Sequence, residues 1–541
     1  MARDGHGGWL AVPTYELAGG RPVVARRARL ALCCRTCCPG CALVTGLLLL
    51  VVCLLAVIFM QAYVEAYVNK MLAFSEDSPT FQSWKKSPIP IKQNVYFFNL
   101  TNKEEFLNGL AKPRVQQVGP YVIGQKKERR DIAFHPNGTL SARLVTKLFF
   151  IWEDSAGSET DLITTINVPM ILAAEKARFQ PPVMRRTISA TLEALGETPI
   201  ITKSVRDLVS GYPDPLLKLA NDMQPPRQNK RFDKFGFFIK KNNSIEQPML
   251  INTGQSDWRR IGVIERYDGS RTLPFWNTRQ CNMINGSGGI YPPGAHEGTT
   301  LYAFARQLCR SLPLLFEKQV LHSKVRTLRF TPPEDVFDSV DTKPENMCYC
   351  VGGPPCAPKG LFNTSICQNG SPTFISFPHF YLADPSIPAK LDGLRPRKEE
   401  HQFFMDIVPR LGTMMKAKIR IQMNFKIGPV QDILYTQSFP DMYYPVFWME
   451  GGVDQLPAEA IKKVQRIMTI VKEARTKVTR VTLVLGSALA LYGAAVLLSR
   501  MRQKRRAESN DKPEEVVEVA AAHGGAPTNG AAPEKGVPQS V

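Results

Sequence analysis

Two long uncharged segments constrain the fold of this chain more than any other feature of its sequence. Residues 42–61 read ALVTGLLLLVVCLLAVIFMQ, and residues 481–499 read VTLVLGSALALYGAAVLLS. Each has about the 20 apolar residues that a helix needs to cross a bilayer, and neither carries the polar stripe of a surface helix. We predict a transmembrane helix at each. A cleaved signal peptide is the alternative for the first segment, although such peptides have a shorter apolar region behind a short basic start.

Basic residues beside these segments predict their orientation, because lysine and arginine accumulate on the cytoplasmic side of membrane helices. These residues are Arg21, Arg26, Arg27, Arg29 and Arg35 before the first segment, and Arg500, Arg502, Lys504, Arg505 and Arg506 after the second. Basic residues also precede the second segment, so its orientation follows mainly from the first helix. We predict cytoplasmic tails at 1–41 and 500–541, with one ectodomain at 62–480.

The N-glycosylation sequons support an exported domain, because all of them fall between the two apolar segments. Their asparagines are Asn99, Asn137, Asn242, Asn285, Asn363 and Asn369. Most of the formal net charge of +20 also lies in this part of the chain. That charge allows anionic lipids or acidic particles as partners, and its extracellular position disfavours nucleic acid.

The cysteines form two groups that call for different chemistry. Six lie in the ectodomain: Cys281, Cys309, Cys348, Cys350, Cys356 and Cys367. In an oxidising compartment they predict three disulfides of open connectivity, with a zinc site at 348, 350 and 356 as the alternative. The other group lies at the cytoplasmic edge of the first apolar segment: Cys33, Cys34, Cys37, Cys38 and Cys41. We predict S-palmitoylation there; free reduced thiols are the alternative.

Strands are expected through most of the ectodomain. Residues 418–427 alternate apolar and polar side chains, which is typical of a strand with one buried and one solvated face. The weaker strand candidates are Val95–Leu100, Leu144–Trp152, Gly262–Tyr267 and Thr373–Phe377. Many strands in one large unit favour a barrel or a sandwich.

Helices are expected between about 163 and 222. Met184, Ile188 and Leu192 share one helical face, and Gly196 is a candidate stop. Asp214 precedes a proline and is a candidate N-cap for the next helix. A further helix at 459–480 carries basic residues that suit either lipid head groups or solvent.

Common catalytic motifs are absent from the sequence, which has no G-x-S-x-G, H-E-x-x-H or P-loop. We interpret the glycine-rich residues 286–289 as a turn and His379 as a packed loop residue. We therefore predict no catalytic residue, metal or cofactor. An ecto-nucleotidase and a trimeric ion channel are alternatives that share the two-helix outline.

Several short motifs, taken together, resemble the class B scavenger receptors. They are VYFFNLTN from Val95, Val118-Gly119-Pro120-Tyr121, Gly211-Tyr212-Pro213-Asp214-Pro215, Trp276 with Cys281-Asn282-Met283-Ile284-Asn285-Gly286, Leu308-Cys309-Arg310-Ser311, Cys348-Tyr349-Cys350, Ser376-Phe377-Pro378-His379-Phe380 and Asp406-Ile407-Val408-Pro409 with Gly412. They run in family order over residues 40–500. The family includes the fatty acid translocase, the high-density-lipoprotein receptor and a lysosomal integral membrane protein.

This resemblance implies an α+β membrane protein. Two transmembrane helices would flank a β-barrel-like ectodomain with an apical helical bundle and an internal hydrophobic tunnel. It implies disulfides Cys281–Cys348, Cys309–Cys367 and Cys350–Cys356. The ligands would be fatty acids, sterols, phospholipids or lipoproteins, and the protein would be a receptor and lipid conduit rather than an enzyme. A homo-oligomer is compatible with these features.

Ligand capture in the family takes place at the apical helices, and some relatives use a lysine at the end of the first of them. Residues 187–202 contain no lysine. Arg185, Arg186 and Lys203 are the candidates to replace it, and ordinary solvated surface charge is the alternative. The tail after residue 500 has no acidic dileucine sequence, which favours the plasma membrane over the lysosome. We expect a cell-surface receptor, with a lysosomal lipid exporter or trafficking receptor as the alternative.

Overall fold

The computed structural model describes residues 66–87, 90–223, 233–454 and 456–510, and several positions between 44 and 64. The chain divides into two compact units, one of residues 62–473 and one of the flanking residues 1–61 and 474–541. The cysteines predicted to carry lipid lie outside the described residues: Cys33, Cys34, Cys37, Cys38 and Cys41.

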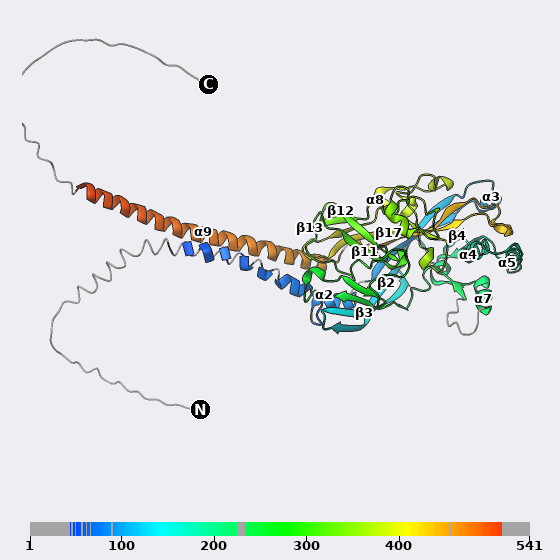
Figure 1. Ribbon diagram of the computed structural model, residues 1–541, viewed down its shortest axis with the longest axis horizontal. Helices are drawn as coiled ribbons and strands as arrows, with labels where there is room; N and C mark the ends of the chain where they lie inside the picture. The colour runs from blue at the N-terminus through cyan, green and yellow to red at the C-terminus, as the bar shows by residue number, and fades with distance from the viewer. Residues whose placement is uncertain are drawn as a thin grey trace, which may run out of the picture. The chain divides into compact units, whose positions relative to one another are not determined.

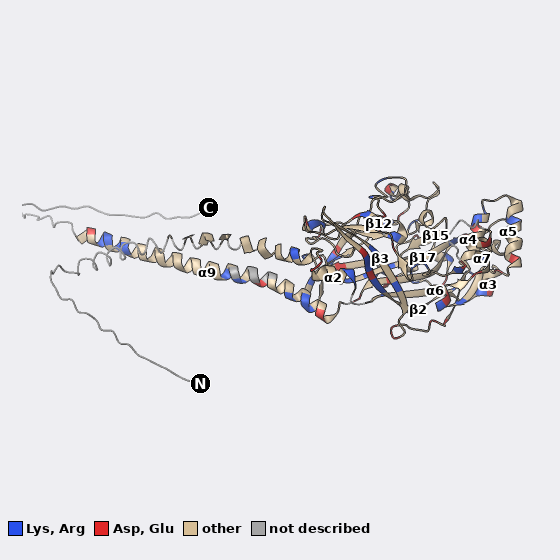
Figure 2. Ribbon diagram, turned by 90° about the horizontal axis from the view of Figure 1, so that it is seen from below, with Lys and Arg blue, Asp and Glu red and all other residues tan. Residues whose placement is uncertain are grey.

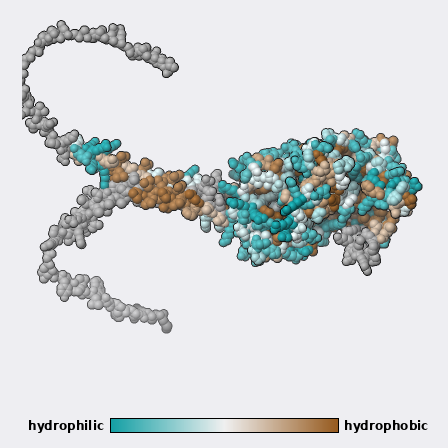
Figure 3. All heavy atoms as spheres, viewed as in Figure 1, coloured by the Kyte–Doolittle hydropathy of each residue, from teal (hydrophilic) through white to brown (hydrophobic). Residues whose placement is uncertain are grey.

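A single helix, α9 (Ala458–Asn510), contains the second apolar segment. Its part Thr479–Asn510 is the one helix in the described residues that is long and apolar enough to cross a membrane. The described helices of the flanking unit have a mostly hydrophobic surface (Figure 3). The described positions of residues 42–61 are helical, but that segment is described only in part. That the two segments cross a membrane therefore stays a prediction for both.

The 62–473 unit is built on one sheet of 14 strands. The main path is β10 (Ile264–Tyr267), β9 (Met249–Asn252), β3 (Thr139–Phe150), β2 (Val115–His135), β1 (Ile91–Leu100), β18 (Met442–Val453), β17 (Met414–Ile427), β16 (Phe404–Ile407), β13 (Val325–Thr331), β12 (Arg310–His322) and β11 (Leu301–Ala305). Strand β8 (Ser244–Ile245) pairs with β3, and β15 (Thr373–Ser376) pairs with β17 and with β14 (Phe362–Asn363). The pairs along this path are antiparallel, as in Figure 1.

The sheet curls until its two end strands meet. The rings of Tyr267 in β10 and Phe304 in β11 lie 5.3 Å apart between centroids. The glycine-rich turn at 286–289 bridges the ends, because the Gly286 carbonyl accepts the N–H of Ile264 at 3.1 Å. Gly286 has φ +143, and an added Cβ would meet the backbone of Phe304 at 2.7 Å, so the close approach requires glycine.

Short elements complete the unit. The helices are α2 (Pro79–Lys85), α3 (Lys103–Leu107), α4 (Val168–Ala177), α5 (Pro182–Ala194), α6 (Val205–Ser210), α7 (Pro215–Asp222) and α8 (Lys398–His401). Two small sheets pair β4 (Leu162–Ile166) with β5 (Ile200–Ser204) and β6 (Tyr212–Pro213) with β7 (Lys234–Phe235). Helices α4, α5 and α7 gather at one end of the unit, which we call the apical end (Figure 1).

Strand β17 forms where its sequence predicts, but its polar face is not solvated. Arg420, Gln422 and Asn424 are buried. The Gln422 side chain accepts the backbone N–H of His379 at 2.6 Å and donates to Asn424 at 2.8 Å, and Asn424 donates to the Ser376 hydroxyl at 3.0 Å. The prediction of a wet face is wrong for these three residues, because the chain around Ser376 and His379 supplies a partner for each amide, whereas the Lys426 side chain is 45% exposed.

Three disulfides fasten the loops beside the sheet. They join Cys281 to Cys348, Cys309 to Cys367 and Cys350 to Cys356. These are the pairs that the resemblance implies. Since all six thiols are bonded to one another, none is left as a thiolate ligand for zinc.

The six asparagines of the sequons differ in exposure. Asn137, Asn242 and Asn369 are exposed, whereas Asn99, Asn285 and Asn363 are half-buried. Asn137 lies in the turn between β2 and β3, where its carbonyl oxygen accepts the Thr139 hydroxyl at 2.7 Å.

Candidate functional site

The apical helices start and stop at residues whose side chains satisfy free backbone groups. The Asn167 side chain accepts the N–H of Met170 at 3.3 Å and begins α4. Asp214 accepts the N–H of Leu217 at 2.9 Å and begins α7, as the sequence predicts. Gly196 takes φ +67 just after α5, the left-handed conformation that commonly ends a helix. The helices therefore occupy the range expected for the capture region.

Two of the three candidate capture residues share one carboxylate. Arg185 donates through Nε and Nη2 to Asp432 Oδ2, at 3.1 and 2.8 Å. Arg186 Nε lies 3.4 Å from Asp432 Oδ1. These guanidinium groups hold the pKa of the Asp432 carboxyl below its usual range. Asp432 lies in the loop between β17 and β18, so the contact fastens α5 to the sheet.

The two arginines differ in how much of each side chain remains free for a ligand. The Arg185 side chain is 12% exposed and fully engaged, whereas that of Arg186 is 73% exposed. Arg186 is therefore the member of the pair that can meet an external anion. Figure 2 shows basic residues on α5 at the apical end.

The third candidate, Lys203, belongs to a different environment. It lies on β5, and its ammonium is 4.5 Å from the centre of the Tyr212 ring. Two buried carboxyls, Glu197 and Asp214, interact with its charge. Burial raises the pKa of both carboxyls, and the charge of Lys203 acts in the opposite direction. Lys203 is half-buried, and its charge offsets those of the two internal carboxyls.

Exposed apolar side chains at the turn from α4 to α5 are a feature that the sequence reading missed. Phe179 is 83% exposed, Val183 76% and Met184 50%. Met184 and Leu192 lie on one face of α5, but only the later turns of the helix pack on α4, so Leu192 is buried and Met184 is exposed. Large exposed apolar groups beside the largely exposed guanidinium of Arg186 suit an amphiphilic surface as ligand.

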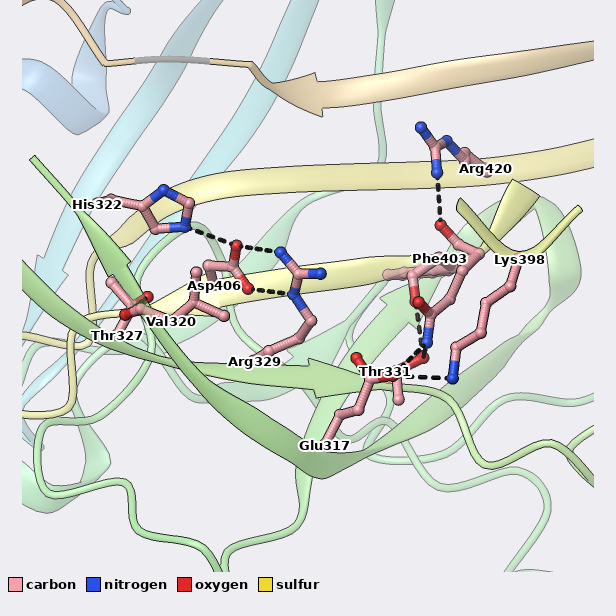
Figure 4. Close-up of polar contacts among 11 residues, drawn as sticks. Glu317, Val320, His322, Thr327, Arg329, Thr331, Lys398, Phe403, Asp406 and Arg420 are labelled. Carbon is pink, nitrogen blue, oxygen red and sulfur yellow. Dashed lines mark hydrogen bonds and ion pairs between the residues drawn. The ribbon is translucent and has the colours of Figure 1, made fainter. Parts of the chain in front are cut away.

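The family-like Asp-Ile-Val-Pro segment has a structural role at Asp406. This carboxylate is fully buried on β16, and Arg329 grips it through two hydrogen bonds of 2.7 and 2.8 Å (Figure 4). His322 Nε2 lies 2.8 Å from its other side. The Thr327 hydroxyl, which lies nearby in Figure 4, already donates to the Val320 carbonyl at 2.9 Å. His322, Arg329 and Asp406 therefore link strands β12, β13 and β16 to one another.

The buried histidines are packing residues. The rings of His379 and His401 stack with centroids 4.5 Å apart. Nδ1 of each ring accepts a backbone N–H, that of Arg395 at 3.0 Å and that of Arg397 at 2.9 Å. The prediction that His379 is a packed loop residue is confirmed. Among the described residues, no group of three His, Cys, Asp or Glu side chains could hold a metal ion.

Comparison with known proteins identifies the family. The sequence model of the CD36 family matches residues 44–497. The chain belongs to the CD36 family. Lysosome membrane protein 2 of Rattus norvegicus is 33% identical over 409 residues, which cover 75% of this chain and 84% of that protein. Scavenger receptor class B member 1 of Sus scrofa is 33% identical over 387 residues, which cover 71% of this chain and 75% of that protein.

Family membership confirms the resemblance that the motifs carry. Proteins of both names match this chain at similar identity. The human lysosome membrane protein 2 is 31% identical over 389 residues, close to the 33% of the scavenger receptor of Sus scrofa. One name denotes a receptor and the other a lysosome membrane protein. Membership of the CD36 family therefore establishes the class of protein. The cellular location of this member is addressed by the proposal below.

Proposed function

We propose that this CD36 family protein is a cell-surface class B scavenger receptor. It binds lipoproteins, fatty acids, sterols or phospholipids at its apical end and passes lipid through the interior of the curled sheet toward the membrane. The observation that carries the proposal is the exposed apolar turn of Phe179, Val183 and Met184 beside the solvated guanidinium of Arg186. Such a surface offers apolar area to acyl chains and positive charge to anionic head groups.

The proposed topology follows from the sequence. Residues 42–61 and 481–499 cross the bilayer, residues 62–480 form the glycosylated ectodomain, and residues 1–41 and 500–541 are cytoplasmic tails. A tunnel through the sheet would shield lipid tails from water, which is worth ~0.8 kcal/mol for each buried methylene. The cysteines at 33–41 would carry palmitate at the cytoplasmic edge of the first helix.

The apical surface can be tested with matched methionines. Met184 is 50% exposed in the apical turn, and Met347 is 47% exposed in the disulfide-bonded region. Full-length protein carrying Met184→Asp should lose binding of phospholipid-coated particles on cells, because a carboxylate would oppose both apolar contact and anionic surfaces. Met347→Asp should bind like the wild type. Equal binding by the two variants, at equal surface expression, would contradict capture at the apical turn.

A lysosomal role within the family is the second candidate function. It is favoured by the similarity to lysosome membrane protein 2. The absence of an acidic dileucine sequence in the tail after residue 500 favours the surface instead. Imaging of the tagged full-length protein separates the two: labelling confined to lysosomes would reject the surface proposal.

A further inference from the structure

A cluster of four cationic side chains lies against the inner face of the sheet. Lys127 and Arg129 are on the face of β2 that also carries Tyr121 and Ile123 into the largest core cluster. Opposite them on β3 are Thr146 and Leu144, the cross-strand partners of Lys127 and Arg129. The two cations therefore project to the same side of the sheet as the core.

The other two cations come from distant parts of the chain. Arg306 directly follows β11 at the end of the sheet and forms an ion pair with Glu246. The N–H of Glu246 in turn donates to the Leu144 carbonyl at 2.9 Å, which brings this pair to β3 beside Arg129. The Lys241 ammonium lies 5.0 Å from the centre of the Phe238 ring. Lys241 lies just before β8, which pairs with β3 at Val145 and Thr146, and the charges of Lys127 and Arg306 act on it.

Positive charge exceeds negative charge in this cluster. Glu246 is the carboxylate paired with Arg306, and Arg129 donates to the carbonyls of Trp84 and Gly288 rather than to a carboxylate. Among the described residues, the structure shows no ion pair for the ammonium of Lys127 or of Lys241. Uncompensated cations inside a protein are costly unless an anion accompanies them.

Burial and mutual repulsion lower the pKa values of the two lysines in this cluster. Burial, with the charges of Arg306 and Arg129, lowers the pKa of Lys127 to about 8. Burial, with the charges of Arg306 and Lys127, lowers the pKa of Lys241 to about 8. All four side chains are nevertheless intermediate in exposure, so each keeps surface that a ligand can contact.

Apolar surface continues from the cluster along the same inner face. Leu148 and Phe150 follow Thr146 on β3 and are only partly buried. Phe237 is also partly buried, and its ring packs 4.9 Å from that of Phe447 on β18. A chain of methylenes lying on these side chains would have its head group at the four cations.

We propose that Lys127, Arg129, Lys241 and Arg306 form an inner anion site. It holds the carboxylate or phosphate of an anionic lipid whose acyl chain lies along Leu148, Phe150 and Phe237. This proposal rests on the proposed function and specifies its cargo: the interior prefers anionic amphiphiles to neutral sterols. A free phosphate ion shares the head-group chemistry and is the other source of an anion.

The strand supplies a matched pair of variants. Lys126 and Lys127 are neighbours, but alternation places Lys126 on the opposite face, where it is exposed. Full-length protein in detergent, stripped of bound lipid, is incubated with radiolabelled palmitate, with cholesterol or with inorganic phosphate. Lys127→Met should weaken palmitate binding about tenfold, the loss of one charge-assisted contact. It should leave cholesterol binding unchanged, and Lys126→Met should change neither.

A pH series separates a head-group contact from a structural effect. Palmitate affinity should fall as the pH rises through about 8, where Lys127 and Lys241 lose their protons. The double variant Lys127→Arg and Lys241→Arg should bind palmitate without that fall, because arginine stays charged.

The outcomes distinguish this inference from the proposed function. Equal palmitate affinity in the wild type, Lys126→Met and Lys127→Met would overturn the inner anion site while lipid binding stands. Phosphate binding that depends on Lys127, without palmitate binding, would overturn its assignment to a lipid. If stripped wild-type protein binds neither palmitate nor cholesterol, the fatty acid and sterol binding of the proposed function fails.

Discussion

The stacked histidines predict that the ectodomain loses stability in mild acid. His379 and His401 are buried, and their rings pack against Phe98 and Trp448. Burial, with the neighbouring ring of His401, lowers the pKa of His379 to about 3. Burial, with the charges of Arg420 and Arg397, lowers that of His401 to about 4. Glu400, the acidic group near His379, opposes this effect only in part.

The sign and size of the effect follow from linkage. The unfolded chain takes up a proton at each histidine below about pH 6.5, whereas the folded ectodomain does not until about pH 3–4. Unfolding therefore binds protons in this window, and the free energy of unfolding falls as the pH falls. At about 1.4 kcal/mol per pH unit for each proton, His379 removes about 2 kcal/mol between pH 6.5 and pH 5. His401, whose pKa is lowered to about 4, contributes with the same sign over this interval.

The variant His379→Gln isolates this effect. Glutamine can keep the donor to Gln117 and the acceptor for the Arg395 N–H but does not titrate. Thermal unfolding of full-length protein in detergent is followed by tryptophan fluorescence at pH 7.5 and pH 5. The wild type should lose about 2–4 °C more in Tm than the variant does over this interval. Equal losses would refute the claim that His379 is neutral and buried in the folded protein.

Three further predictions follow from particular contacts. Arg185→Ala should increase amide hydrogen exchange across α5, because the bidentate contact with Asp432 is lost, whereas Arg186→Ala should not. Asn424→Leu should lower the free energy of unfolding by about 2–4 kcal/mol in denaturant titrations, since it leaves buried partners unsatisfied. Replacing Cys309 and Cys367 with serine should cost about 4 kcal/mol by the chain-entropy model, for a separation of 58 residues; an unchanged Tm would contradict it.

Local sequence predicts the elements whose determinants are local. Asp214 caps α7, Gly196 follows the end of α5, and β1 and β15 form within a few residues of their predicted ranges. Each depends on capping, on glycine conformation or on a short apolar run, and all of these can be read from neighbouring residues.

Long-range packing limits what the sequence reveals about faces. Alternation in β17 correctly predicts a strand, but the chain around Ser376 and His379 makes its polar face an interior one. Strand β2 carries many charged residues and no simple alternation, so the sequence predicts no strand there. The inner position of Lys127 and Arg129 depends on the curl of the whole sheet, which no local pattern contains.

The candidate capture residues show the same limit. Their sequence positions at the apical helices were predicted, but Asp432 comes from a loop far along the chain and occupies Arg185. Lys203 interacts electrostatically with the carboxyls of Glu197 and Asp214. Charge in a sequence does not say which cations already have internal partners. The exposed Phe179 and Val183 could have been noticed as apolar residues in a proline-rich turn.

The proposed function requires that lipid occupies the interior of the ectodomain. The most direct measurement is quantitative mass spectrometry of lipids extracted from the purified full-length protein. A matched membrane protein purified in the same detergent gives the background. We expect at least one lipid molecule per chain above that background, enriched in anionic species. Lipid at the background level in a folded, disulfide-bonded preparation would contradict it.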